Sequence, residues 1–486
     1  MGGAWSRLTK GFNRKKHIDQ ENLMPYVMDM IDDRRREYFI ELGKAISIPS
    51  VSAFEDHHKN IYEMSSLIRK KLENLGAHVR FLSSGRNPPV VLADLKAPNG
   101  SRNKKTLLIY GHLDVQPAFR SDGWETNPFQ MVRKGNKLYG RGASDDKGPV
   151  LGWIHAVAAL KDTLNDLPVN IKFLFEGMEE SGSKGLEDIL ESMKDSSFLK
   201  KVDYVCISDS YWLGKNKPCL GYGIRGNVNF EISVTCASQD LHSGVFGGPI
   251  NEAMTDLIKL LDTLVDQDGR ILIEGLYDEI APVTSDEIEL YNNVEFEVNE
   301  YKNDIGVNKL VTGDDKIKTL MATWRYPSLS IHGIEGAFSD TGAKTVIPKK
   351  VIGKFSIRIV PDLTVEKTAD LVQRHLKKEY EQLNTPNIID LKFEGSESWI
   401  TSTQNKNFEA ARKATRDIYG DDPDLTRGGG SIPVVPILDR IIGKPILLLP
   451  MGASDDDAHA QNEKIDVRNY IEGTKLFASY LFHLGH

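Results

Sequence analysis

A short apolar stretch that ends in a histidine and an aspartate is the first place in this sequence where side chains could do chemistry. Residues 107–114 read LLIYGHLD, and a continuous apolar run of this length predicts a buried strand. His112 and Asp114 are two residues apart, so on a strand they point to the same side. Taken alone, the pair fits a metal ligand beside an acidic partner as well as it fits two side chains that only hydrogen-bond each other.

Two adjacent aspartates follow in a glycine-rich turn, GRGASDDKGP, at residues 140–149. The glycines allow a tight turn, and the proline suits the first turn of a helix. Asp145 and Asp146 would repel each other unless a cation or Lys147 offset their charge, which makes this pair a candidate source of a metal ligand. An acidic cap at the N-terminus of the helix is the alternative explanation.

Further carboxylates follow two other buried strands. The strand predicted over residues 171–175 leads to Glu179 and Glu180. Consecutive side chains project in different directions, so one glutamate could bind a metal while its neighbour faces the reacting water. A solvated acidic loop is the alternative. The strand predicted over residues 202–209 ends at Asp209.

The last candidate is His459, which lies among acidic residues in a loop after the strand predicted over residues 445–449. By itself it fits a solvated loop histidine. In open α/β sheets, however, sites form at the carboxyl ends of the strands. The repeated placement of histidines and carboxylates after strands therefore predicts one common site, which no single stretch would predict alone.

The order of predicted elements indicates an α/β catalytic domain with a smaller inserted domain. Helices and strands alternate through the first part of the chain, starting with a helix predicted over residues 24–48. After Gly223 the pattern changes to an α+β layer of normal domain size, and the chain then returns to the first domain. We expect four segments, which are a basic tail at 1–20, catalytic segments at 21–222 and 394–486, and the insert at 223–393.

Composition excludes several classes of protein. The 486 residues carry a net charge of −8, so the surface as a whole is no nucleic-acid footprint. No apolar stretch approaches the roughly 20 residues that span a bilayer. The N-terminus has no apolar segment typical of a secretory signal, and the three cysteines form no CxxC pair. These features favour a reducing, cytoplasmic location.

The first residues carry a separate signal. Gly2 and Ser6 fit the pattern for N-myristoylation, and basic residues follow within the next ten positions. One acyl chain with a basic patch would give weak membrane association. A leader without a fixed structure is the alternative.

The combined side chains suit a pair of divalent metal ions. They offer imidazole and carboxylate groups without thiolate, a set that suits Zn or Mn. Five ligands, with one bridging carboxylate, are enough for two ions. Glu179 could activate a metal-bridging water and pass its proton to the leaving amine. The five expected ligands are His112, Asp145, Glu180, Asp209 and His459.

Six motifs in this order resemble those of the M20 family of dinuclear metallopeptidases, in the branch of cytosolic non-specific dipeptidases and carnosinases. They are GHLDVQP, GRGASDDKGP, EGMEESGS, DLHSGVFGG, FSIRIVP and GASDDDAHAQNE. The resemblance covers the chain after about the first twenty residues. It implies that the inserted domain is a lid that also forms a homodimer, and that the substrate is a dipeptide.

The resemblance also implies a role for each matching residue. Asp145 would bridge the metals, His112 and Asp209 would hold one ion, and Glu180 and His459 the other. Asp114 would tune His112, and Glu179 would be the general base. Three matches would bind the substrate, with Arg358 on its carboxylate. His242 would reach across the dimer to stabilise the oxyanion. The two remaining substrate contacts would be Thr345 and Ser431.

One position departs from the family pattern. Relatives commonly read T-R-E-G-G-S-I-P where this chain has Gly428 in place of the glutamate. A carboxylate there would suit a substrate amino group, so we expect weaker dependence on a free N-terminus. The leading prediction is hydrolysis of dipeptides and short peptides that have a free C-terminal carboxylate. The alternatives are an N-acyl-amino-acid amidohydrolase of the same family and a non-catalytic binding protein on this fold.

Overall fold

The strand predicted before His112 lies in the middle of the large sheet. A computed structural model describes residues 23–486, so the predicted basic tail and the acylation at Gly2 lie outside the described residues. Strand β3 is buried along its whole length and pairs in parallel with β6 and β7. The sheet has nine strands, ordered β1-β2-β6-β3-β7-β17-β8-β15, with β16 beside β8. Their bounds are β1 (His78–Leu82), β2 (Val90–Leu95), β3 (Thr106–His112), β6 (Asn170–Glu176), β7 (Tyr204–Ile207), β8 (Cys219–Ile224), β15 (Trp399–Ile400), β16 (Asp424–Gly428) and β17 (Ile446–Leu448).

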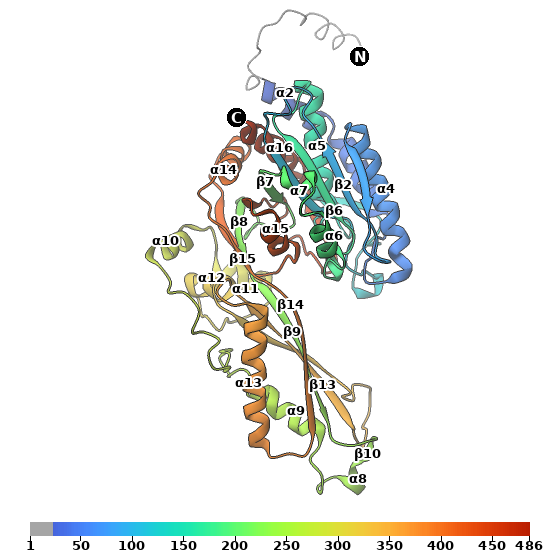
Figure 1. The fold of residues 1–486 in the computed structure, drawn as a ribbon, viewed down its shortest axis with the longest axis vertical. Helices are drawn as coiled ribbons and strands as arrows, with labels where there is room; N and C mark the ends of the chain where they lie inside the picture. The colour runs from blue at the N-terminus through green and yellow to red at the C-terminus, as the bar shows by residue number, and fades with distance from the viewer. Residues whose placement is uncertain (1–22) are drawn as a thin grey trace, which may run out of the picture.

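Helices cover both faces of this sheet, which confirms the predicted α/β class (Figure 1). On β3, Leu107 and Ile109 face one apolar core, and Leu108 and Tyr110 face the other. This alternation is the two-residue period of a strand. The first core contains α2 (Met24–Asp33), α3 (Arg35–Ile46), α4 (His58–Asn74), α5 (Lys147–Leu164), α14 (Lys406–Tyr419) and α16 (Val467–Gly485), and the second contains α6 (Leu186–Met193), α7 (Ser197–Lys200) and α15 (Val434–Ile442).

The first helix differs from the prediction. One helix was expected over residues 24–48, but the chain forms α2 and α3 with a break at Arg34. The break falls within the charged run DDRRRE at residues 32–37, where no apolar residue continues the helical stripe. Arg34 instead points its guanidinium at Asp162, at 2.9 Å.

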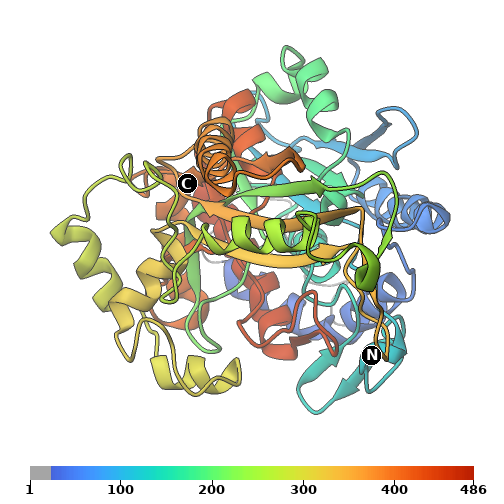
Figure 2. The ribbon, with the colours of Figure 1, turned by 90° about the horizontal axis from the view of Figure 1, so that it is seen from below.

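The inserted domain is a four-stranded antiparallel sheet backed by helices. Its strands are ordered β11-β13-β9-β14, and α9 and α13 pack against it around a separate apolar core. The domain projects from the catalytic domain as an elongated lobe, and Figure 2 looks along that lobe. These observations confirm the predicted insert. The bounds are β9 (Gly226–Thr235), α9 (Ala253–Asp262), β11 (Ser328–Glu335), β13 (Lys350–Ile359), α13 (Val365–Leu383) and β14 (Ile388–Ser396).

Smaller elements complete the fold around the site. Three helices, α10 (Ser285–Asn293), α11 (Val298–Asp304) and α12 (Lys316–Trp324), lie at the junction of the two lobes in Figure 1. Two strands pair at the end of the lid, β10 (Leu241–His242) and β12 (Val346–Ile347), next to the short helix α8 (Ser243–Phe246). Strands β4 (Val132–Lys134), β5 (Lys137–Tyr139) and β18 (Lys464–Asp466) form a small sheet. Within residues 23–486, no helix combines the length and the apolar character that a membrane crossing requires.

Candidate metal centre

The expected ligands meet where four parallel strands end. Strands β3, β6, β7 and β17 lie side by side in parallel, so their carboxyl ends share one edge of the sheet. His112 is the last residue of β3, and its Nε2 lies 2.9 Å from Asp145 Oδ1 and 3.8 Å from Asp209 Oδ1. The predicted gathering of these side chains at a strand edge is therefore present in the structure.

The second histidine approaches the same aspartate from the other side. His459 Nε2 lies 3.0 Å from Asp145 Oδ2 and 3.1 Å from Glu180 Oε2. Each oxygen of Asp145 thus faces a different imidazole, which is the placement that a bridging carboxylate needs. Glu180 also accepts a hydrogen bond from Gln116 Nε2 at 2.9 Å.

The structure separates the two adjacent aspartates. The carboxylate of Asp146 accepts a hydrogen bond from the backbone amide of His112, at 3.1 Å. Asp146 is buried, and burial raises the pKa of its carboxyl well above the usual value. Asp145 is therefore the member of the pair that faces the ligand cluster. The peptide bond between Asp145 and Asp146 is cis.

Asp114 holds the turn that carries the two glutamates. Its buried carboxylate accepts hydrogen bonds from the backbone amides of Glu179, at 3.2 Å, and Glu180, at 3.0 Å. His112 Nδ1 lies 3.1 Å from the backbone carbonyl oxygen of Asp114 and 3.5 Å from its carboxylate. Asp114 thus contacts the histidine mainly through its main chain and the glutamate turn through its side chain.

The charges of the cluster fit divalent cations. Four carboxylates, from Asp145, Glu179, Glu180 and Asp209, lie around two imidazoles. Burial and the charge of Asp209 raise the pKa of Glu179 well above its ordinary value, and burial with the charge of Asp145 raises that of Glu180. Crowded buried carboxylates that resist ionisation are stabilised by a cation of high charge. Ligand atoms lie within 4.8 Å of one another in two sets, His112, Asp145 and Glu180, and His112, Glu179 and Asp209.

The imidazoles respond to the same carboxylates. Burial lowers the pKa of His112, but the nearby carboxylates of Asp114, Asp145 and Asp209 raise it well above the ordinary value. Hydrogen bonds to Asp145 and Glu180 raise the pKa of His459 to about 11.

A third group of carboxylates, from Asp455, Asp456 and Asp466, lies apart from these ligands. It surrounds the ammonium of Lys464, which balances its charge without a metal ion.

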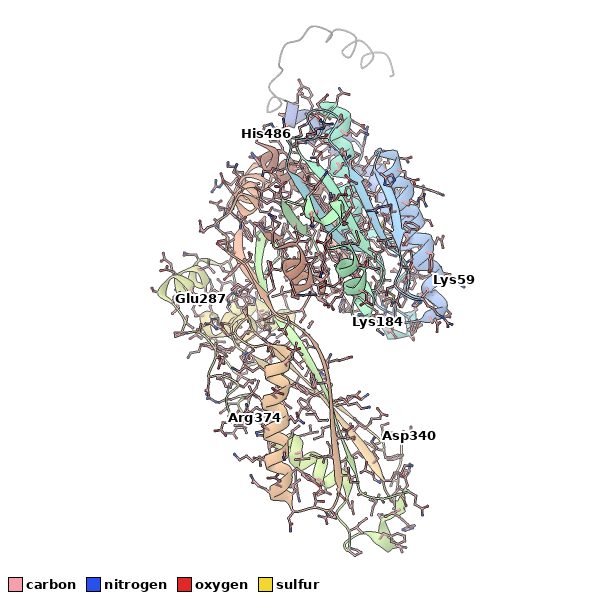
Figure 3. The ribbon with its side chains drawn as sticks, viewed as in Figure 1. Lys59, Lys184, Glu287, Asp340, Arg374 and His486 are labelled. Atoms are coloured by element: carbon pink, nitrogen blue, oxygen red, sulfur yellow. The ribbon has the colours of Figure 1, made fainter. Side chains whose placement is uncertain are left out.

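A cavity of about 640 Å³ opens beside the cluster, a size suited to a small-molecule ligand. Asp145, Glu179, Asp209 and His459 line it at one end, and α12 and the loop at residues 428–431 form other parts of its wall. Arg427 in this wall forms an ion pair with Glu287 of α10, at 3.0 Å, and Figure 3 labels Glu287 at the junction of the catalytic and inserted domains. The remaining wall is mainly apolar, with Trp212, Leu213, Ile224, Trp324, Ile432 and Leu448.

Two of the expected substrate contacts lie together at this cavity. Arg358 Nη1 donates a hydrogen bond to Ser431 Oγ at 2.9 Å, and Ser431 lines the cavity. Burial lowers the pKa of the Arg358 guanidinium. Among residues 23–486 the structure gives Arg358 no carboxylate partner within 4.0 Å, so a half-buried positive charge stands ready for an anion.

The third expected substrate contact, Thr345, and the expected oxyanion residue, His242, lie elsewhere in the chain. His242 is the last residue of β10 and Thr345 directly precedes β12, and Ser243 N donates to the carbonyl oxygen of Thr345 at 3.1 Å. Both side chains are exposed, and β10 lies at the far end of the lobe in Figure 1, away from the catalytic domain. One chain by itself does not bring these residues to the cluster. Figure 3 labels Asp340 on the same lid, in the loop before Thr345.

The sequence did not predict two buried charged residues next to the ligands. Arg141 and Glu463 are buried beneath Asp145 and His459 and form an ion pair at 2.9 Å. Both stand inside the motifs GRGASDDKGP and GASDDDAHAQNE, so charged residues within a motif were the available signal. Their hydrogen bonds go to each other and to backbone groups of the two segments that carry Asp145 and His459.

The fold and this edge-of-sheet cluster define a hydrolase of the two-lobed α/β type, and the comparisons identify its family. The sequence pattern described as peptidase family M20/M25/M40 matches residues 108–483. The chain belongs to this family, which confirms the prediction, and it is an enzyme of the metallodipeptidase branch.

Similar proteins and structures agree over nearly the whole chain. The chain is 46% identical to the Cys-Gly metallodipeptidase DUG1 of Candida albicans, over 94% of this chain and 97% of the relative. It is 44% identical to the Beta-Ala-His dipeptidase of Homo sapiens, over 95% and 93%. Its structure matches the di-peptidase Dug1p of Saccharomyces cerevisiae with a TM-score of 0.87 and 44% identity, over 95% and 98% of the two chains. Human carnosine dipeptidase 1 matches with a TM-score of 0.87 and 44% identity, over 95% and 99%.

Proposed function

We propose that this protein hydrolyses dipeptides and short peptides with a free C-terminal carboxylate, using two divalent metal ions. The observation that carries the proposal is the cluster at the shared strand edge, where each oxygen of Asp145 faces a different histidine. His112 and Asp209 would hold one ion, Glu180 and His459 the other, and Asp145 both. The donors, imidazole and carboxylate without thiolate, favour Zn or Mn.

Metal ions bound there would polarise the scissile carbonyl and make water acidic enough to react at neutral pH. Glu179 lines the cavity, and burial with the charge of Asp209 raises its pKa above the ordinary value, which makes its carboxylate a stronger proton acceptor. We infer that Glu179 takes the proton from the attacking water and delivers it to the leaving amine. Asp114 keeps Glu179 and Glu180 in place through their backbone amides.

The substrate carboxylate has a matching site. Arg358 carries a half-buried charge beside Ser431, and an arginine can bind a carboxylate through two parallel hydrogen bonds. A dipeptide whose carboxylate rests on Arg358 would extend into the cavity toward Glu179 and Asp145. This arrangement supports a carboxypeptidase-like preference for substrates with a free C-terminus.

We further propose that the active protein is a homodimer. His242 and Thr345 are exposed at the end of the lid, remote from the cluster of their own chain. A second subunit whose lid end met the cavity would bring His242 to the oxyanion and Thr345 to the substrate.

We also propose a cytoplasmic location. The free cysteines at positions 206, 219 and 236 support it, because thiols stay reduced in that compartment.

One observation supports a second activity, the hydrolysis of N-acyl-amino acids. Gly428, Gly429 and Gly430 line the cavity without side chains, so this wall offers no carboxylate to a substrate amino group. Hydrolysis of N-acyl-amino acids would then be tolerated.

The test is hydrolysis of a panel of dipeptides, amidated dipeptides and N-acetylated amino acids by metal-free protein, with and without added Zn²⁺ or Mn²⁺. We expect cleavage of the free dipeptides only with added metal, and loss of cleavage when the C-terminus is amidated. Cleavage that survives complete metal removal would refute the proposal. A panel left intact under every condition would refute the proposed substrate class.

A further inference from the structure

Among the expected ligands, His459 has the side chain that packing restrains least. Its side chain is 58% exposed, whereas those of His112 and Asp145 are 0% and 7% exposed. Packing therefore does not hold its ring in place. Its backbone φ is +63°, and the loop contains two more non-glycine residues in this left-handed region, Asp457 and Asn462. Such conformations persist only where surrounding contacts impose them.

One buried arginine supplies two such contacts to the backbone at His459. Arg141 Nη2 donates hydrogen bonds to the carbonyl oxygens of His459, at 3.2 Å, and Ala460, at 3.0 Å. The guanidinium lies over the ring of Trp124, 5.3 Å from its centroid, and only 2% of the residue is exposed. The backbone that presents His459 is thus tied to the segment that contains Asp145.

Glu463 completes the connection. Its fully buried carboxylate accepts a hydrogen bond from Arg141 Nη1 at 2.9 Å and from the backbone amide of Gly142 at 2.9 Å. The other carboxylate oxygen accepts from the amides of Ser144, at 2.9 Å, and Asp145, at 3.1 Å. One side chain therefore fixes the Asp145 segment, and its ion pair with Arg141 fixes the His459 segment relative to it.

We propose that Arg141 and Glu463 are positioning residues that set the separation of Asp145 and His459 and thereby the affinity for the ion between them. This inference rests on the proposed metal site. Neither residue contacts that ion, since both lie beneath the ligand backbones. Outer partners of metal ligands commonly change metal affinity by about 10–100-fold.

The most informative variant is Arg141→Lys, which keeps a positive charge against Glu463. A lysine has a single ammonium and cannot reach the carboxylate and two carbonyl oxygens in the fixed geometry of a guanidinium. Metal-free protein would be titrated with Zn²⁺ in competition with a chromophoric chelator. Circular dichroism and the melting temperature of the metal-free form would establish that the variant is folded. We expect one of two Zn²⁺ equivalents to bind about 10–100-fold more weakly.

Removing one charge alone could unfold the protein, because it leaves the other buried and unpaired. The double variant Arg141→Gln with Glu463→Gln removes both charges and should show the same loss of one binding step. Asp166→Asn is the matched control, since Asp166 pairs with Lys104 at 2.6 Å, is 7% exposed and does not contact either ligand segment. It should lower the melting temperature without changing Zn²⁺ affinity.

His459→Ala distinguishes failure of this inference from failure of the site. It should weaken the same binding step as Arg141→Lys. Unchanged Zn²⁺ binding in His459→Ala would refute the proposed metal site, and the positioning role with it. Weakened binding in His459→Ala, together with wild-type binding by folded Arg141→Lys, would overturn the positioning role alone.

Discussion

The carboxylate of Asp114 accepts a hydrogen bond from the backbone amide of Glu180, at 3.0 Å, and a second one from that of Glu179, at 3.2 Å. Asp114 thus fixes the backbone from which the expected ligand Glu180 and the expected base Glu179 extend. This arrangement links β3 to the turn after β6, and it makes Asp114 a sensitive point for substitution.

Asp114→Ala should lose both acceptors and release the turn. We expect kcat to fall about 100-fold and metal affinity to fall about 10–100-fold, as is usual for partners of metal ligands. Asp114→Asn keeps one oxygen able to accept from one amide, so its losses should be smaller. Kinetics and chelator competition would measure both effects, and an Asp114→Ala variant with wild-type values would contradict the assignment.

His242 offers a test of the shared site. Co-expression of His242→Ala with Glu179→Gln under two affinity tags would isolate mixed dimers. In such a dimer one of the two sites combines an intact Glu179 with an intact His242 of the partner subunit. We expect about half of the wild-type activity in mixed dimers and almost none in either parent. If mixed dimers are as inactive as both parents, His242 does not act across the interface.

Gly428→Glu should change the discrimination between free and acylated substrates. A Cβ at this position would lie 3.2 Å from Ile224 Cγ2, so the side chain fits after a small shift. The new carboxylate could pair with a substrate ammonium, a charge-assisted contact worth roughly 1.5–3 kcal/mol. We expect kcat/KM for free dipeptides, relative to N-acetylated ones, to rise at least about tenfold.

Gly428→Gln is its uncharged control and should leave this ratio near that of the wild type. Wild-type protein that already rejects every N-acetylated substrate would contradict the prediction.

Metal binding should release protons and strengthen with pH. Carboxylates raise the pKa of His112 well above its usual value and that of His459 to about 11, so protons compete with the metal ion for both rings. Only the neutral imidazole binds a metal, so the ion displaces protons. The apparent Kd for Zn²⁺ should therefore fall as pH rises from 6 to 8. Calorimetry in buffers of different ionisation heat would count the protons, and a Kd that is constant over this range would contradict the assignment.

The sequence was informative where function depends on local pattern. The apolar run before His112 predicts a buried strand because each of its residues meets a core on one face of the sheet or the other. The convergence of the ligands was predictable because parallel strands place their carboxyl ends at one edge. Which of Asp145 and Asp146 faces the ligand cluster could not be predicted, because it depends on the conformation of the turn that carries them.

Other features depend on contacts between distant segments. Strand β8 contains Gly221 and Gly223, which weaken strand propensity, yet Gly221 is needed because a Cβ there would lie 2.8 Å from Leu448 Cβ. Arg141 and Glu463 are 322 residues apart, so no local pattern joins them. The predicted single helix over residues 24–48 was wrong because a charged run interrupts its apolar stripe.

The proposed mechanism depends most on Glu179 as the general base, and the variant Glu179→Gln tests this role most directly. Glutamine is nearly isosteric, keeps the backbone amide that donates to Asp114, and cannot take a proton from water. Turnover of a dipeptide and bound metal would be measured on the same preparation, beside wild type. We predict two metal equivalents in both proteins and a kcat lowered about 10²–10⁴-fold in the variant. A fully loaded Glu179→Gln protein with wild-type turnover would contradict the account.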